Sequence, residues 1–108
     1  MTDFQVVLCN CPTNELAEQI AQHLVEEKLA ACVNIIPNVQ SFYIWENTLV
    51  KDQETTLLIK TTRSCFNALE KAIINLHTYQ IPEIIALPIT NGHQPYFTWL
   101  KENTRNLL

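Results

Sequence analysis

The sequence predicts an α+β domain in which an antiparallel sheet carries two helices on one face. Three observations lead to this fold class. The predicted elements follow one another as strand, helix, strand, strand, helix, strand, with one more helix at the end. That order is the ferredoxin-like, or split βαβ, pattern. Both longer helices have a single apolar face and need one layer to pack on. A chain of 108 residues with 47% hydrophobic and 17% charged residues is expected to form one globular domain over residues 1–108.

The first strand is predicted over Phe4–Cys9, an apolar run rich in Val and Leu that is typical of a buried strand. Pro12 interrupts it, and Thr13 or Asn14 can cap the helix that follows. We predict this helix over Glu15–Ala30, because its apolar residues recur at the spacing of one helical face. These residues are Leu16, Ala17, Ile20, Ala21, Leu24, Val25 and Leu29.

The two central strands are predicted to be unusually long. One runs over Cys32–Ile36 and resumes over Val39–Trp45, and the interruption at Pro37-Asn38 indicates an edge strand or a bulge. A turn at Glu46–Thr48 leads into the other, over Leu49–Thr61. Both exceed the usual strand length. We therefore expect their tips to project beyond the domain and pair with another subunit.

The second half of the chain repeats the helix and strand pattern. Thr62 or Ser64 is expected to start a helix, which is followed by a strand over Ile84–Ile89. Pro95 suits the first turn of a last helix over Tyr96–Asn103. The buried face of the middle helix is predicted to consist of Phe66, Leu69, Ala72, Ile73 and Leu76.

Composition excludes several classes of function. Seven cationic and eleven anionic residues give a formal charge of −4, with scattered cations, so nucleic-acid binding is not expected. No apolar run is long enough to span a membrane, and no export signal precedes the first strand, so we expect a cytoplasmic location. The four cysteines form no paired C-x-x-C motif, which argues against a structural zinc site and for reduced thiols. The sequence contains no recognised catalytic motif, and we do not expect an enzyme.

Cys9, His77 and Glu83 are the candidate metal ligands. His77 and Glu83 flank a Pro-restrained turn, and Cys9 ends the first predicted strand. A thiol and an imidazole suit copper or zinc, and the carboxylate broadens the range of divalent cations. In the alternative interpretation Cys9 is core packing, His77 caps the end of a helix, and Glu83 pairs between subunits.

Cys9 and Cys11 offer a second arrangement. If the strand continues to Cys11, both thiols lie on one side of it and can chelate a soft cation. The interpretation we favour from the sequence is that the strand ends at Asn10, with one thiol buried and the other in the turn.

Five further residues are expected at a subunit interface or in a cleft. Tyr43 and Trp45 are aromatic anchors of the kind that interfaces favour. Glu54 and Lys60 lie six residues apart on one strand and hence on the same side. A buried Glu54 needs a partner, and Tyr79 or a neighbouring chain can supply it.

Six segments of the chain resemble those of the CutA divalent-cation-tolerance family in their order and spacing. They are Val6–Cys9, Glu27–Asn34, Ser41–Glu46, Glu54–Thr61, His77–Glu83 and Tyr96–Leu100. The resemblance implies a homotrimer of ferredoxin-like subunits, similar in architecture to PII signalling proteins, and it does not imply an established catalytic activity. It also implies a role in tolerance of copper and other divalent metals, with copper as the bound ion and zinc or another divalent cation as alternatives. The second hypothesis is a PII-like trimeric signalling or scaffold module without a physiological metal.

Overall fold

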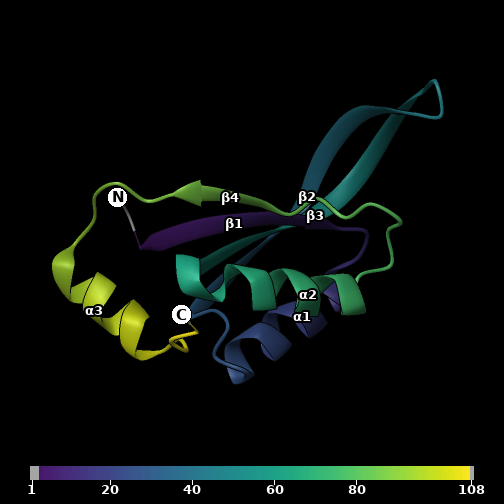
Figure 1. Ribbon diagram of the computed structural model, residues 1–108. Helices are drawn as coiled ribbons and strands as arrows, with labels where there is room; N and C mark the ends of the chain where they lie inside the picture. Colours follow the sequence, from purple (N-terminus) through teal and green to yellow (C-terminus); the bar gives the residue numbers. More distant parts are fainter. Residues whose placement is uncertain (1–2, 108) are drawn as a thin grey trace.

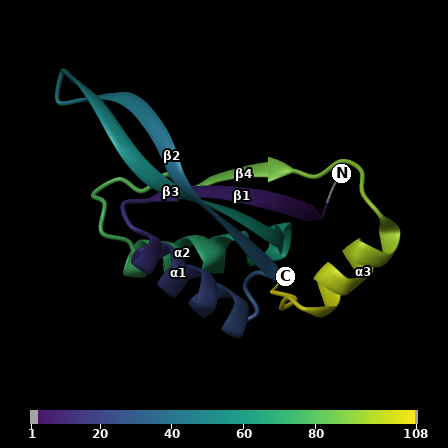
Figure 2. The same cartoon turned by 180° about the vertical axis from the view of Figure 1, so that it is seen from behind.

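One four-stranded antiparallel sheet forms the centre of the molecule, and α1 and α2 cover one of its faces (Figures 1 and 2). The computed structural model describes residues 3–107. The strand order is β2-β3-β1-β4, so the predicted ferredoxin-like fold is confirmed. The elements are β1 (Phe4–Cys11), α1 (Asn14–Glu26), β2 (Cys32–Trp45), β3 (Thr48–Thr62), a short 3-10 turn (Arg63–Cys65), α2 (Phe66–Leu76), β4 (Ile85–Pro88) and α3 (Gln94–Glu102).

The core lies between the sheet and the two helices. From Val7 to Cys11, every second residue of β1 is fully buried on the helix side, as the alternation of side chains in a strand requires. The two helices contribute their apolar faces to the same layer. Fully buried members of this core include Val7, Cys9, Cys11, Ile20, Leu24, Leu57, Leu69 and Ile73.

β1 is two residues longer than the sequence predicted. Its ladder with β3 continues to the pair Cys11 and Thr55. The next residue, Pro12, has no amide hydrogen with which to extend the ladder. Cys9 and Cys11 therefore both face the helices, and both are 0% exposed. The expectation that the strand ends at Asn10 and leaves one thiol in the turn is wrong.

α1 is shorter than predicted. Its start agrees with the sequence, because Thr13 is the N-cap and its Oγ1 accepts a hydrogen bond from the Leu16 amide at 3.1 Å. Its last helical residue is Glu26, because Lys28 adopts a left-handed backbone with φ of 56°. The amides of Leu29 and Ala30 both turn back to the Leu24 carbonyl. The apolar period thus continues past the helix into a buried turn.

β2 and β3 form a long hairpin that projects away from the rest of the domain (Figures 1 and 2). The register shifts between Ile36 and Val39, and Asn38 there has φ of 62°. This shift and the outer position of β2 confirm the bulge and the edge strand predicted from Pro37-Asn38. Glu46 and Asn47 close the hairpin with positive φ at both positions, as in a type I′ turn.

The remaining boundaries differ little from the prediction. β4 is four residues long, although the Ile89 amide still donates to the Phe4 carbonyl at 3.0 Å. α3 starts at Gln94, and Pro95 occupies its first turn as expected. Among residues 3–107 there is no helix with the length and hydropathy needed to cross a bilayer.

Candidate metal centre and adjoining cleft

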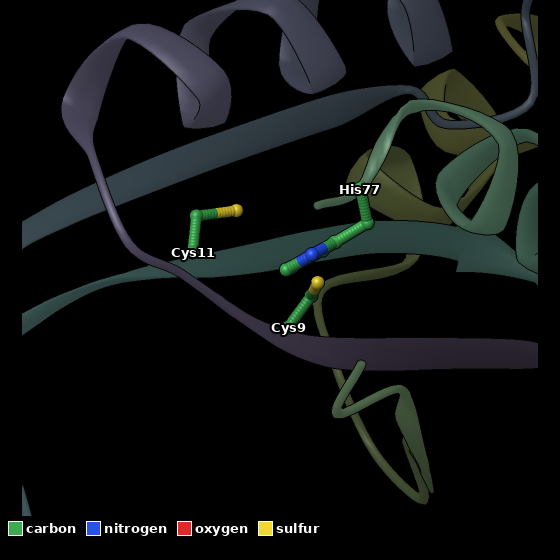
Figure 3. Close-up of side chains that lie close together, drawn as sticks. All are labelled: Cys9, Cys11 and His77. Atoms are coloured by element: carbon green, nitrogen blue, oxygen red, sulfur yellow. The ribbon is translucent and has the colours of Figure 1, made fainter. Parts of the chain in front are cut away.

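Three side chains with metal-binding atoms meet on the helix side of the sheet (Figure 3). They are Cys9 and Cys11 from β1 and His77 from the residue that follows α2. One ligand atom from each lies within 4.8 Å of the other two. The thiols are buried and the imidazole is half-buried, so a bound ion would be largely shielded from water.

Two hydrogen bonds fix the imidazole ring of His77. Its Nδ1 accepts from the Tyr79 amide at 3.1 Å, and its Nε2 lies 2.8 Å from the Asn10 carbonyl oxygen. A backbone amide can only donate and a carbonyl can only accept. The neutral ring must therefore carry its proton on Nε2, and both ring nitrogens are engaged. The backbone of His77 also ends α2, with its amide 2.8 Å from the Ile73 carbonyl.

The two thiols have different acidities. A hydrogen bond with Cys11, together with burial, raises the pKa of the Cys9 thiol. The same hydrogen bond lowers the pKa of Cys11, against the opposing effect of burial. Cys11 is thus the more acidic of the two thiols. Since the thiolate is the form that binds a metal, binding by both sulfurs requires release of the Cys9 proton.

Glu83 lies apart from the three clustered ligands. It belongs to the loop before β4, and its Oε1 accepts from Asn10 Nδ2 at 3.2 Å. The Asn10 side chain points away from the helix layer, because it stands between two strand residues that face the helices. The structure therefore brings together Cys9 and His77 of the predicted set, places Cys11 beside them, and puts Glu83 on the other side of β1.

On that other side, a cavity of about 790 Å³ lies between the hairpin and the loop after α2. Four of the five predicted cleft residues line it, and Asn10 and Glu83 lie at the same cavity. The four are Tyr43, Trp45, Glu54 and Tyr79. Lys60 is not among the lining residues, and its Nζ instead contacts Asn34 Oδ1. We call this cavity the cleft.

The cleft presents carboxylates and phenols. Glu54 is 6% exposed, and its Oε2 accepts from the Tyr79 hydroxyl at 2.6 Å, so the contact expected between these residues is present. Burial, followed by this hydrogen bond, raises the pKa of Tyr79. The Tyr43 hydroxyl donates to Asp52 Oδ2 at 2.5 Å, and that bond raises the pKa of Tyr43 to about 12. Both phenols therefore stay protonated donors at neutral pH.

Known proteins match both the sequence and the fold of this chain. The family model described as "CutA1 divalent ion tolerance protein" matches residues 5–103. The chain belongs to the CutA family. The "Divalent-cation tolerance protein CutA" of Thermus thermophilus is 51% identical over 100 residues, which cover 93% of this chain and 97% of that protein. The chloroplastic CutA protein of Arabidopsis thaliana is 46% identical over 101 residues, which cover 94% of this chain and 56% of that protein.

Solved CutA structures share the fold. The Thermus thermophilus structure has a TM-score of 0.93 at 50% identity and covers 94% of this chain and 99% of that one. The structure of the CutA protein described as periplasmic, from Archaeoglobus fulgidus, has a TM-score of 0.90 at 35% identity and covers 93% and 97% of the two chains. The ferredoxin-like arrangement is thus common to the compared CutA proteins.

Replacing Glu83 of this CutA chain by Gln tests the electrostatics of the cleft. Burial, followed by the nearby Glu54 carboxylate, raises the pKa of Glu83. A raised folded-state pKa means that the protonated form stabilises the fold below the unfolded-state pKa, and that this contribution is lost as the pH rises through the folded-state pKa. Gln keeps the oxygen that accepts from Asn10 but carries no charge.

We expect Glu83→Gln to be slightly more stable than the wild type at pH 7, by less than about 1 kcal/mol because solvent screens the group. The difference should shrink to zero as the pH falls below the unfolded-state pKa of Glu, about 4.3. Urea unfolding of both proteins at several pH values measures it. A stability difference that stays constant with pH would contradict the raised pKa.

Proposed function

We propose that this CutA protein binds copper through Cys9, Cys11 and His77, and that this binding contributes to tolerance of copper and other divalent metals. The observation that carries the proposal is the convergence of two thiols and an imidazole within 4.8 Å. Sulfur and imidazole donors favour copper, with zinc or another divalent cation as the alternative ion. The matching family model and the Thermus thermophilus relative are both named for tolerance of divalent ions, which supports the same role.

The spacing of the donors fits a single ion. A zinc–sulfur bond is about 2.3 Å long, so two sulfurs on one ion can be at most about 4.6 Å apart. Donor atoms within 4.8 Å therefore need only small side-chain rotations to converge. All four cysteines are free, which leaves the thiols available and is consistent with a reducing cytoplasm as the location. The proposed activity is binding, and we assign no catalytic step.

Titration calorimetry with Cu(I), Cu(II) and Zn(II) tests the ligand set. We expect Cys9→Ser and Cys11→Ser each to lower Cu(I) affinity more than about 100-fold. This loss exceeds the usual effect of replacing a residue that only hydrogen-bonds to a metal ligand. His77→Ala should lower it less, because the two softest donors remain. Cys65→Ser is the matched control. Cys65 is also fully buried, but its sulfur bonds to the Arg105 carbonyl instead. Unchanged Cu(I) affinity in both Cys9→Ser and Cys11→Ser would refute the site.

The assembly we propose is a homotrimer that associates through the projecting hairpins.

The cleft favours a second candidate function, a PII-like signalling or scaffold module whose clefts bind a small effector and which has no physiological metal. Its support is a cavity of about 790 Å³ lined by aromatic and carboxylate side chains. A crystal grown with excess copper distinguishes the two functions. Copper at Cys9 and Cys11 supports metal binding, whereas copper only at the exposed His23 and His93 supports the module.

A further inference from the structure

A metal ion cannot use His77 without displacing one of its present partners. The Tyr79 amide occupies Nδ1, and the Asn10 carbonyl engages the proton on Nε2. An ion that takes Nδ1 removes the acceptor of the Tyr79 amide. An ion that takes Nε2 expels the proton donated to Asn10 and leaves that carbonyl with a lone pair facing the ring. Either choice perturbs a backbone group next to the imidazole.

Both displaced groups belong to residues that line the cleft. The Tyr79 hydroxyl donates to Glu54 at 2.6 Å. The Asn10 side chain donates to Glu83 at 3.2 Å and accepts from the Thr56 hydroxyl at 2.7 Å. The imidazole thus connects the clustered ligands on one side of β1 with the polar groups of the cleft on the other side.

Asn10 belongs to β1, whereas the segment that carries the imidazole and the Tyr79 amide is free of ladder bonds. Residues 77–84 connect α2 to β4 and lie in neither a helix nor a strand. His77, Tyr79 and Glu83 all lie on it, so a shift of the imidazole can carry the phenol and the carboxylate with it. The rigid sheet beside it, by contrast, keeps Cys9 and Cys11 in place.

We propose that metal binding at Cys9, Cys11 and His77 changes the shape of the cleft through the loop 77–84. This inference rests on the proposed metal-binding function. His77 is then the positioning residue that couples the two sides of β1. Coupling of this kind is reciprocal. If the bound metal changes the affinity of the cleft for a molecule by some factor, that molecule changes the affinity of the site for the metal by the same factor, which is typically about 5- to 150-fold.

Zinc is the probe for this coupling, because Zn(II) has no redox chemistry of its own. Trp45 lines the cleft and reports on it by fluorescence, once Trp99, the other tryptophan, is replaced by Phe. Calorimetry of the same protein reports zinc binding independently. We expect the Trp45 emission to change along the zinc titration and to saturate at the same equivalents of zinc as the heat.

His77→Asn in the same Trp99→Phe protein removes the link and keeps both thiols. We expect it to bind zinc more weakly with no change in Trp45 emission at saturation. Gln80→Ala is the matched control from the same loop, and it should retain the emission change. An equal emission change in zinc-loaded His77→Asn would overturn the coupling, because the signal would then bypass the imidazole.

Amide hydrogen exchange of residues 77–84 in the wild-type protein gives a second measurement that needs no variant. Faster exchange in the zinc-bound protein supports the coupling. Zinc binding by calorimetry with neither an emission change nor an exchange change overturns the coupling and leaves the proposed function intact. Failure of zinc and copper to bind at all refutes the proposed function and the coupling with it.

Discussion

Replacing Ile44 by Glu together with Leu49 by Lys is expected to convert the protein from the proposed trimer to a single chain in solution. The two residues are cross-strand partners near the tip of the hairpin and are 64% and 67% exposed in the isolated chain. Phe42, two residues earlier in the same strand, is 62% exposed. An apolar strip of this kind on an exposed ribbon is typical of a surface that another subunit covers.

The charge pair is chosen to separate association from folding. Glu and Lys directly opposite each other on antiparallel strands attract, so the hairpin keeps a favourable cross-strand contact. Burial of the same two charges in a subunit interface is costly. The substitutions therefore act on the interface and spare the ribbon. Val25→Glu is the control, since Val25 is also exposed but lies on α1, away from the hairpin.

Light scattering measures the outcome directly. The mass should fall from that of three chains to that of one chain of 12.4 kDa. The melting temperature should fall as well and lose its dependence on protein concentration, because association no longer adds to stability. A wild-type protein that is already monomeric at micromolar concentration would refute the trimer. A double variant that remains trimeric would show that the chains associate through another surface.

The features that the sequence predicted well are those with a local physical cause. Pro37-Asn38 interrupts an extended run in any context, and the structure has a bulge there. Within a helix, proline fits best in the first turn, and Pro95 lies in the first turn of α3. The end of α1 had no such signal. Lys28 takes the left-handed conformation that Gly or Asn usually provides, so the apolar period alone gave a helix that was too long.

The arrangement of the candidate site depended on long-range pairing. Whether Cys11 joins Cys9 is decided by how far β1 pairs with β3, and no residue near Cys11 encodes the ladder that reaches Thr55. Once that ladder extends past Asn10, the alternation of the strand sends both thiols to one face and the Asn10 side chain to the other. Glu83 lies on the same side as the Asn10 side chain, because the two are joined by a hydrogen bond. A shift of two residues in a strand end thus decides which side chains can share a metal.

Ile73→Ala is expected to destabilise the protein by about 2–5 kcal/mol, because it leaves a cavity in a packed core. Ile73 is fully buried in α2, between the helix and the sheet. The next residue provides a matched control. Ile74 has the same side chain on the same helix but is 52% exposed, so Ile74→Ala should cost less than about 1 kcal/mol. Urea unfolding at one fixed protein concentration measures both.

The same pair of variants also connects the core to the candidate metal centre. The amide of His77 donates to the Ile73 carbonyl. The position of the last turn of α2 on the sheet therefore determines how far the imidazole lies from the two thiols. A metal site loses affinity when a supporting side chain no longer holds a metal-binding residue in position and that residue shifts by a fraction of an ångström. Cu(I) affinity should therefore fall in Ile73→Ala and stay unchanged in Ile74→Ala. Equal stability losses in the two variants would mean that α2 does not pack on the sheet through Ile73. An unchanged Cu(I) affinity in a destabilised Ile73→Ala protein would show instead that the thiols bind copper without help from the helix.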